Sequence, residues 1–377
     1  MKRAATVVIC GAWIVGALVA VGGVTAIAAP GVPTPSEDIV DLVTRLGLVE
    51  EQTPVRERAG WRPPRTIVVR PAGPGLVEAL RQVAPGVKFV EAGTAEAAAM
   101  LAAKADAVLG FCAADLLAAG PNVRWIQSYS AGVEQCVAIP ALRERDILLT
   151  NMQRVAGPVM AEHVLAMMFA FARGLDFYIP EHSARRWTPT SRMVTLDGKT
   201  VLVVGLGGIG TEVAKRAHAL GMKVDAVRAS GREGPEYVRE VGLPADLLRL
   251  AATADFIVNT TPLTPATRQL YDAKFFAAAK PGAYFFNVGR GQSVVQSALV
   301  DALRSGRLAG AGLDVTDPEP LPADDVMWSL PNVILTPHVS ARSDLGDALR
   351  VAILRENVRR YVQGERMLSV VDTRRGY

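Results

Sequence analysis

Short apolar runs and helical segments alternate along most of the chain, beginning near residue 65. Five runs of strand type come first, separated by Ala- and Leu-rich pieces with helical spacing. These runs are Thr66–Val69, Val87–Glu91, Ala107–Phe111, Arg124–Tyr129 and Ile147–Asn151. Regular alternation of strand and helix predicts a parallel sheet covered by helices on both faces.

A second series of the same kind starts at residue 200. A long, mostly apolar helix is expected before it, over residues 158–173, and a final helix is expected over residues 345–362. The strand-type runs are Thr200–Val204, Lys223–Val227, Phe256–Asn259, Ala283–Val288, Ala311–Val315 and Val333–Thr336. The sequence therefore predicts an α/β protein with two doubly wound parallel-sheet domains.

The amino end of the chain lacks this alternation of strand-type runs and helices. Lys2 and Arg3 precede the uncharged run Ala4–Ala29, and the next charged residue is Glu37. A basic start, an apolar stretch and a final A-x-A pattern are typical of a secretory signal, and the run is also long enough for a membrane anchor. We therefore expect residues 1–29 to direct export to the periplasm or to anchor the protein outside, with no other membrane contact. A cytoplasmic product of a later start is the alternative.

Composition excludes several classes of protein. Half of the 377 residues are hydrophobic and the net charge is only +4, so neither disorder nor a nucleic-acid-binding surface is expected. Three cysteines are too few for a disulfide-rich scaffold. No motif with metal-ligand spacing occurs, and no metal is expected. A folded enzyme or a binding protein remains.

The first strand of the second series runs directly into a glycine-rich loop, and a helix follows. The loop glycines are Gly205, Gly207, Gly208 and Gly210, with Ile209 between the last two. Glycines at this spacing permit a tight turn, close approach of backbone to a pyrophosphate, and close helix–strand packing. Within a strand–turn–helix context the motif predicts a dinucleotide site.

The end of the next strand suggests which dinucleotide binds. Arg228 occupies the position where an NAD-binding domain carries an acid for the ribose hydroxyls, and Asp225 is expected within the strand. Arg228, Ser230 and Arg232 would suit a 2′-phosphate. We expect NADP(H) to be preferred, with NAD(H) as the alternative; a solvated basic loop is the other interpretation.

Five segments together resemble the D-isomer-specific 2-hydroxyacid dehydrogenase family, and the resemblance spans about residues 66–362. They are the glycine-rich loop, Thr261–Thr267, Asn287–Gly291, Leu313–Pro320 and Thr336–His338. The resemblance implies a flavodoxin-like substrate domain into which a Rossmann dinucleotide-binding domain is inserted. The expected divisions are a linker at 30–64 that carries one short amphipathic helix near residues 37–43, the first part of the substrate domain at 65–157, the nucleotide domain at 158–342, and a returning C-terminal helix at 343–377. The resemblance also implies that the protein is a homodimer.

The resemblance assigns catalysis to Arg290, Glu319 and His338. Arg290 would hold the substrate carboxylate and carbonyl, and His338 would donate or accept the proton while Glu319 orients its ring. The loop Ser130-Ala131-Gly132 would offer backbone amides to the substrate carboxylate, although a plain turn is the other interpretation. Further cofactor contacts implied by the resemblance are Thr261, Pro262, Gly289, Arg290, Asp314 and His338.

Other histidines and the cysteines receive ordinary interpretations. His163 is expected to be structural, on the long apolar helix, and His182 and His218 are expected at the surface. Cys112 and Cys136 follow neighbouring strand-type runs, so a disulfide is an alternative to two buried thiols.

Two functions are compatible with these residues. The first is an oxidoreductase that interconverts small 2-oxo acids, such as glyoxylate or hydroxypyruvate, with D-2-hydroxy acids. The second is a dinucleotide-sensing binding or regulatory protein of the same fold. The catalytic residues favour the enzyme.

Overall fold

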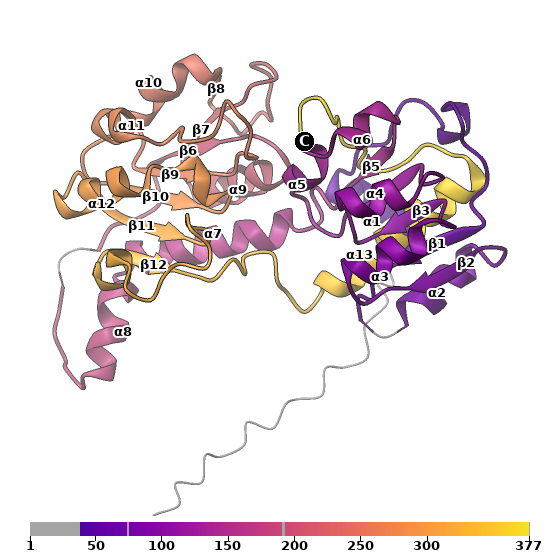
Figure 1. Ribbon diagram of the computed structural model, residues 1–377. Coiled ribbons are helices and arrows are strands. Elements are labelled where there is room, and N and C mark those ends of the chain that lie inside the picture. The colour runs from indigo at the N-terminus through magenta and orange to yellow at the C-terminus, as the bar shows by residue number, and fades with distance from the viewer. Residues whose placement is uncertain (1–37, 74, 191–192, 377) are drawn as a thin grey trace, which may run out of the picture.

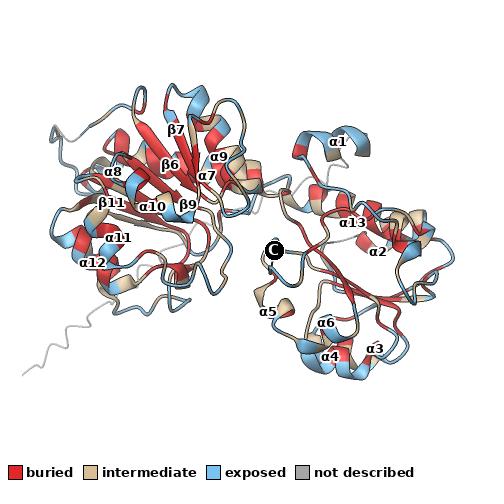
Figure 2. Ribbon diagram, turned by 90° about the horizontal axis from the view of Figure 1, so that it is seen from above, coloured by how far each residue is buried: buried red, intermediate tan, exposed pale blue. Residues whose placement is uncertain are grey.

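The computed structural model describes residues 38–73, 75–190 and 193–376. They form two α/β domains, each around its own parallel sheet (Figure 1). Buried residues are concentrated on the strands and on the helix faces that cover them (Figure 2). The predicted pair of parallel-sheet domains is confirmed.

The first sheet has five strands in the spatial order β2-β1-β3-β4-β5, and all neighbours pair in parallel. This order is the flavodoxin-like one. The strands are β1 (Thr66–Val69), β2 (Lys88–Glu91), β3 (Ala107–Leu109), β4 (Trp125–Gln127) and β5 (Leu148–Thr150). The helices between or after them are α2 (Leu76–Val83), α3 (Ala95–Ala102), α4 (Ala114–Ala119), α5 (Glu134–Val137) and α6 (Pro140–Glu144).

Part of the expected linker belongs to this domain. Helix α1 (Ile39–Leu46) begins after Asp38, whose carboxylate accepts a hydrogen bond from the Val40 amide. Its residues Leu42 and Leu46 are buried in the core of the first sheet, and the short helix η1 (Val55–Glu57) adds Val55. An amphipathic helix needs cover for its apolar face, and the first domain provides that cover. Residues 39–57 are therefore not a free linker.

The chain returns to the first domain at its end. Helix α13 (Gly346–Gln363) packs against α2, and its apolar residues enter the same core. Tyr361 stacks on Trp125 of β4, with ring centroids 4.5 Å apart. Asn357 Nδ2 donates to the buried Gln127 Oε1 at 2.8 Å. The final helix is therefore part of the core of the first domain.

The second sheet has seven strands, all parallel, in the order β12-β11-β10-β9-β6-β7-β8. The strands are β6 (Thr200–Val204), β7 (Lys223–Val227), β8 (Glu240–Gly242), β9 (Phe256–Asn259), β10 (Ala283–Asn287), β11 (Leu308–Leu313) and β12 (Val333–Leu335). Its helices are α9 (Gly208–Ala219), α10 (Leu247–Ala251), α11 (Ala273–Ala278) and α12 (Gln296–Arg304), with short helices η2 (Pro244–Asp246), η3 (Gly291–Ser293) and η4 (Val326–Ser329). Strands β7 and β8 lie on one side of β6, and strands β9 to β12 lie on the other, so the strand order reverses at β6. Ligands bind at such reversal points. The pattern missed β8, a three-residue strand at the edge of the sheet.

Two helices lie between the two series of strands in the chain. The predicted long helix is α7 (Gly157–Ala172), which lies along α9 and buries residues on most of its sides. Helix α8 (Leu175–Ser183) follows and projects from the nucleotide domain (Figure 1).

The expected signal or anchor, residues 4–29, lies outside the described residues. Within the described ranges, no helix has the length and apolar character needed to cross a membrane.

Candidate active site

The glycine-rich loop joins β6 to α9 at the reversal point of the second sheet. Gly205 has a φ of 98°, which side chains rarely adopt, and a Cβ there would lie 3.0 Å from the carbonyl carbon of Thr260. A Cβ on Gly210 would lie 1.9 Å from the Gly205 carbonyl oxygen, so the close helix–strand packing requires glycine. Nothing lies within 4 Å of an ideal Cβ on Gly207. The loop is therefore packed on one side and open at Gly207.

Helix α9 starts at this open position without a side-chain cap. The first intrahelical bond runs from Thr211 N to Gly207 O, at 2.9 Å. The amides of Gly208, Ile209 and Gly210 have no acceptor among the described residues. Unpaired amides at the positive end of a helix dipole form an anion site, so the loop fits a pyrophosphate.

Strand β7 ends at Val227, and Arg228 is the next residue. Asp225 lies inside the strand and is 1% exposed, and its carboxylate pairs with Arg239. Its carboxylate is therefore not available to ribose hydroxyls. The structure places a basic residue, not an acid, at the carboxyl end of this strand.

Two of the three expected basic-loop residues lie together. Arg228 Nε donates to Ser230 Oγ at 2.9 Å, and Arg228 Nη1 donates to the Glu233 carbonyl at 2.9 Å. Arg232 instead forms a 2.9 Å ion pair with Asp246, which offsets its charge. Arg228 and Ser230 are therefore the stronger candidates for a 2′-phosphate.

The loops after β9 and β10 carry Thr261, Pro262 and Gly289. Thr261 donates to Asn259 Oδ1 from both its amide (3.0 Å) and its hydroxyl (2.7 Å). A Cβ on Gly289 would lie 2.8 Å from the Thr261 carbonyl oxygen, so the two loops are in contact. Both follow parallel strands, which places them at the same sheet edge as Gly205.

A buried polar network holds the backbone of Arg290. Asn259 Nδ2 donates to Asn287 Oδ1 and to Ser293 Oγ, both at 2.9 Å. Asn287 Nδ2 (3.0 Å) and Ser293 Oγ (2.6 Å) in turn donate to the Arg290 carbonyl. All three side chains are at most 1% exposed, where polar groups need partners. Our sequence reasoning did not assign Asn259 or Ser293, although an asparagine that ends an apolar strand, as Asn259 ends β9, is a detectable signal.

The Arg290 guanidinium extends to the first domain. A Cβ on Gly132 would lie 1.7 Å from Arg290 Nη2, so only glycine leaves room there. Arg290 Nε lies 3.1 Å from Glu134 Oε1, and Nη2 lies 3.4 Å from Glu134 Oε2. The structure thus brings Arg290 and the predicted substrate loop together, and it adds Glu134, which sequence reasoning missed.

The loop after β4 leaves two donors for a carboxylate. The carbonyls of Ser130, Ala131 and Gly132 accept hydrogen bonds from Met152 N, Asn151 Nδ2 and Ser130 Oγ. The amides of Ala131 and Gly132 have no acceptor among the described residues. Amides beside a guanidinium suit a carboxylate.

His338 and Glu319 form a direct pair. Glu319 Oε1 lies 2.5 Å from His338 Nδ1, and the other ring nitrogen has no partner in the described part of the chain. The side chains are 46% and 38% exposed, so the pair is open to solvent and substrate. A Cβ on Gly291 would lie 1.8 Å from the Thr316 carbonyl oxygen, so the Arg290 loop touches the segment leading to Glu319.

Asp314 lies beneath the His338 loop instead of open to solvent. It is 1% exposed and accepts hydrogen bonds from Thr336 Oγ1 (2.6 Å), Val339 N (2.9 Å) and Ser340 N (3.0 Å). Burial alone would raise the pKa of Asp314, but the hydrogen bonds outweigh it and lower that pKa. Its place favours positioning of His338 over the expected direct cofactor contact.

The remaining histidines lie apart from the Glu319–His338 pair. His163 Nε2 lies 3.0 Å from Thr336 Oγ1, so α7 supports the same loop. His218 stacks on Tyr237, with ring centroids 5.8 Å apart. No cluster of potential metal ligands occurs among residues 38–73, 75–190 and 193–376.

Cys112 and Cys136 form a disulfide. The bond joins the loop after β3 to α5, the helix that begins with Glu134. The disulfide replaces the two buried thiols that the sequence favours, because strand-like runs alone do not show how closely their ends approach.

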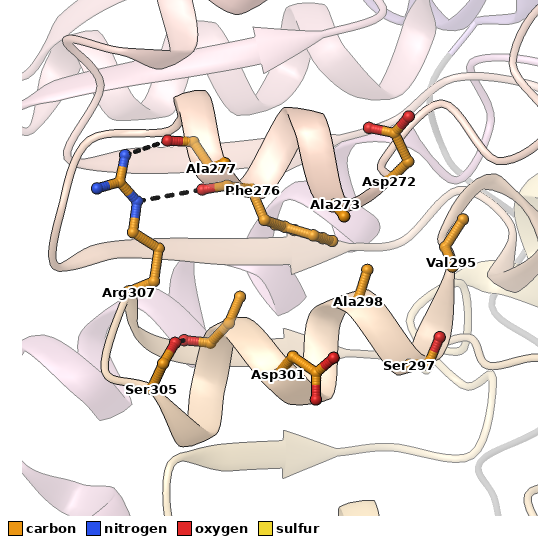
Figure 3. A pocket seen from close by; sticks show the side chains of 11 residues that line it. Asp272, Ala273, Phe276, Ala277, Val295, Ser297, Ala298, Asp301, Ser305 and Arg307 are labelled. Carbon is orange, nitrogen blue, oxygen red and sulfur yellow. Dashed lines mark hydrogen bonds between the residues drawn. The ribbon is translucent and has the colours of Figure 1, made fainter.

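A hollow of about 720 Å³ lies elsewhere, between α11 and α12. Figure 3 shows its lining, with the Arg307 guanidinium at one end bonded to the carbonyls of Phe276 and Ala277. None of the predicted site residues lines it.

Comparisons with known proteins agree with this geometry. Residues 165–340 match the family model "D-isomer specific 2-hydroxyacid dehydrogenase, NAD binding domain". Glyoxylate/hydroxypyruvate reductase B of Citrobacter koseri is 34% identical over 256 residues, which are 66% of this chain and 78% of the relative. The chain belongs to the D-isomer specific 2-hydroxyacid dehydrogenase family. This membership confirms the expected enzyme, an oxidoreductase acting on CH–OH groups.

Other relatives extend the likeness to the whole fold. Human glyoxylate reductase/hydroxypyruvate reductase is 33% identical, covering 67% of this chain and 78% of its own. An NADPH-dependent glyoxylate/hydroxypyruvate reductase of Sinorhizobium meliloti, solved with NADP and sulfate, has a TM-score of 0.71 and 30% identity, covering 83% of this chain and 100% of its own. A family member from Xanthobacter autotrophicus, solved with NADPH and MES, has a TM-score of 0.72 and 29% identity over the same shares.

Proposed function

We propose that this enzyme reduces small 2-oxo acids to D-2-hydroxy acids and prefers NADPH to NADH. The observation that carries the proposal is the contact of Arg290 with the loop whose Ala131 and Gly132 amides have no acceptor among the described residues. That arrangement fits a carboxylate, and the Glu319–His338 pair supplies a proton donor at the same sheet edge.

The dinucleotide fits the second domain. The amides of Gly208, Ile209 and Gly210 would hold its pyrophosphate, and Arg228 with Ser230 would hold a 2′-phosphate. When bound, the nicotinamide supplies the hydride. Solved relatives that carry NADPH or NADP support the preference.

The residues of this chain supply binding and proton transfer. Arg290 and the loop amides hold the substrate carboxylate and polarise the neighbouring carbonyl. His338, held by Glu319 at Nδ1, donates a proton from Nε2 to the developing alkoxide and removes it in the reverse reaction. Asp314 fixes the loop that presents His338.

The substrate class follows from the relatives. Those named glyoxylate/hydroxypyruvate reductases share the family with this chain and are 33% and 34% identical to it over the aligned residues. We therefore propose glyoxylate and hydroxypyruvate as the substrates to test first.

Two further expectations are proposals as well. In and just after the projecting helix α8, Ile179 is 63% exposed and Trp187 is 101% exposed, and large apolar side chains open to solvent are typical of an interface. We propose that a second copy of this chain covers them, and the mass of the enzyme in solution tests it. We also propose export or outward anchoring through residues 4–29, which cell fractionation and amino-terminal sequencing would test; a cytosolic product with Met1 would contradict it.

A substrate panel tests the reaction. Initial rates with NADPH should be high for glyoxylate and hydroxypyruvate and near zero for succinic semialdehyde, whose carbonyl lacks an adjacent carboxylate. His338→Ala should lose most turnover while keeping its affinity for NADPH. Equal rates with the semialdehyde would contradict the assigned role of Arg290.

A further inference from the structure

The Glu134–Arg290 ion pair joins the two domains at the proposed substrate site. Glu134 is the first residue of α5 in the first domain, and Arg290 follows β10 in the second. Their side chains are 26% and 29% exposed, so the pair is partly shielded from water. An ion pair that is partly shielded from water stabilises a structure more than one at an open surface.

The two carboxylate oxygens of Glu134 occupy one side of the guanidinium. Oε1 faces Nε at 3.1 Å and Oε2 faces Nη2 at 3.4 Å. Arg290 Nη1 donates to the Gly289 carbonyl at 2.8 Å. Because arginine has five N–H donors, one N–H on Nη1 and one on Nη2 remain.

The remaining donors lie beside the carboxylate-binding loop. Arg290 Nη2 sits directly over Gly132, since a Cβ there would be 1.7 Å away. The amides of Ala131 and Gly132 are also without acceptors among the described residues. The remaining N–H groups of Arg290 and the loop amides can therefore share a substrate carboxylate.

We propose that Glu134 is a positioning residue for substrate reduction, which fixes the side of the Arg290 guanidinium so that its free N–H groups face the substrate carboxylate. This inference rests on the proposed function. A carboxylate that contacts two guanidinium nitrogens restricts a long, flexible side chain to one orientation, so less freedom is lost when the substrate binds.

The disulfide explains how Glu134 is itself held. Helix α5 has only four residues, and a helix of that length is not stable alone. Cys136, two residues beyond Glu134, is bonded to Cys112 in the loop after β3. The covalent bond thus fixes the short helix whose first residue holds Arg290.

An opposite role would give an opposite result. If Glu134 competed with the substrate for Arg290, its removal would free the guanidinium and tighten substrate binding. Positioning predicts that removal weakens binding. The sign of the change in substrate affinity therefore decides between the two roles.

The test uses the full-length enzyme with Glu134→Gln, Glu134→Ala and Glu134→Asp. The matched control is Asp146→Asn, which removes a 2.8 Å ion pair with Arg58 elsewhere in the first domain. Measurements are KM and kcat for hydroxypyruvate, KM for NADPH, and the Kd of oxalate, an unreactive dicarboxylate, for the NADP⁺-loaded enzyme by calorimetry.

Glu134→Gln and Glu134→Ala should raise KM for hydroxypyruvate and Kd for oxalate by about tenfold or more, the effect of removing a charged hydrogen bond. KM for NADPH should not change, and Glu134→Asp should recover part of the loss. In an Arg290→Lys background, Glu134→Gln should change the oxalate Kd less than twofold, because its effect passes through Arg290.

An unchanged or lower hydroxypyruvate KM and oxalate Kd in Glu134→Gln would overturn the inference while leaving the proposed function intact. An unmodified enzyme that neither reduces hydroxypyruvate nor binds oxalate would overturn both. A loss of equal size in Asp146→Asn would show a general effect of the first domain and would also overturn the inference.

Discussion

Adding one methyl group at Gly132 should separate folding from catalysis. The Cβ of Gly132→Ala would lie 1.7 Å from Arg290 Nη2, whereas an ordinary contact begins at about 3.4 Å. The guanidinium must therefore move by about 1.7 Å. The same Cβ would lie 2.9 Å from Glu134 Oε2, so the ion pair is disturbed as well. Both contacts are the ends of flexible side chains, which can move without unfolding the loop.

The size of the effect follows from that displacement. Misplacing a catalytic group by about 1 Å can cost about 100-fold in rate. We therefore expect kcat/KM for hydroxypyruvate to fall at least about 100-fold, or about 2.7 kcal/mol of transition-state stabilisation. The free energy of unfolding should change by no more than about 1 kcal/mol, because the backbone at Gly132 does not require a positive φ.

Steady-state kinetics and urea unfolding on the same preparations test this expectation. Gly86→Ala is the matched control, since nothing lies within 4 Å of its ideal Cβ and its φ is not positive. NADPH affinity should be unchanged in both variants. A Gly132→Ala enzyme with near-normal kcat/KM would refute the placement of Arg290 against this loop.

Four other predictions follow from the site. Arg228→Asp should narrow or reverse the NADPH preference, by about 1.5–3 kcal/mol for each charged hydrogen bond that the 2′-phosphate no longer receives; equal efficiency of the unmodified enzyme with both cofactors would contradict this. Glu319→Gln should lower kcat for reduction and leave NADPH affinity unchanged, because Glu319 holds the His338 ring at Nδ1; an unchanged kcat would remove the role of Glu319. Because the pKa of Asp314 is lowered in the folded state, its stabilisation should be complete above the ordinary aspartate range and should disappear as pH falls; the stability difference from Asp314→Asn should therefore shrink in acid, which unfolding at several pH values measures. Serine at both ends of the Cys112–Cys136 disulfide should lower the free energy of unfolding by about 3–4 kcal/mol, given the 24-residue separation; two free thiols in the oxidised protein would rule the bond out.

The periodic pattern predicted most of the fold because both sheets are buried on both faces. Strands such as β6 read as continuous apolar runs, so their positions could be assigned to within a residue or two. The pattern failed where burial is partial or distant. Strand β8 is short and lies at an edge. The pattern predicts the amphipathic helix α1 but not its place in the first domain, because the surface that covers it lies in another part of the chain.

The site was predictable where a local motif carries the chemistry. The glycine-rich loop and the basic end of β7 required only neighbouring residues for their interpretation. Glu134 could not be found in that way, because its partner Arg290 lies 156 residues further along the chain. The resemblance assigns Asp314 to cofactor contact. Its burial under the His338 loop, which the sequence does not show, favours a positioning role.

One measurement tests the central claim most directly. Hydroxypyruvate and NADPH are mixed in equimolar amounts, and the enzyme is added. The loss of NADPH absorbance is followed, and the product is then resolved on a chiral column. The account predicts complete oxidation of NADPH and formation of D-glycerate. NADPH that binds but remains reduced, or an L- or racemic product, would contradict it, and the first of these results would favour a dinucleotide-sensing protein instead.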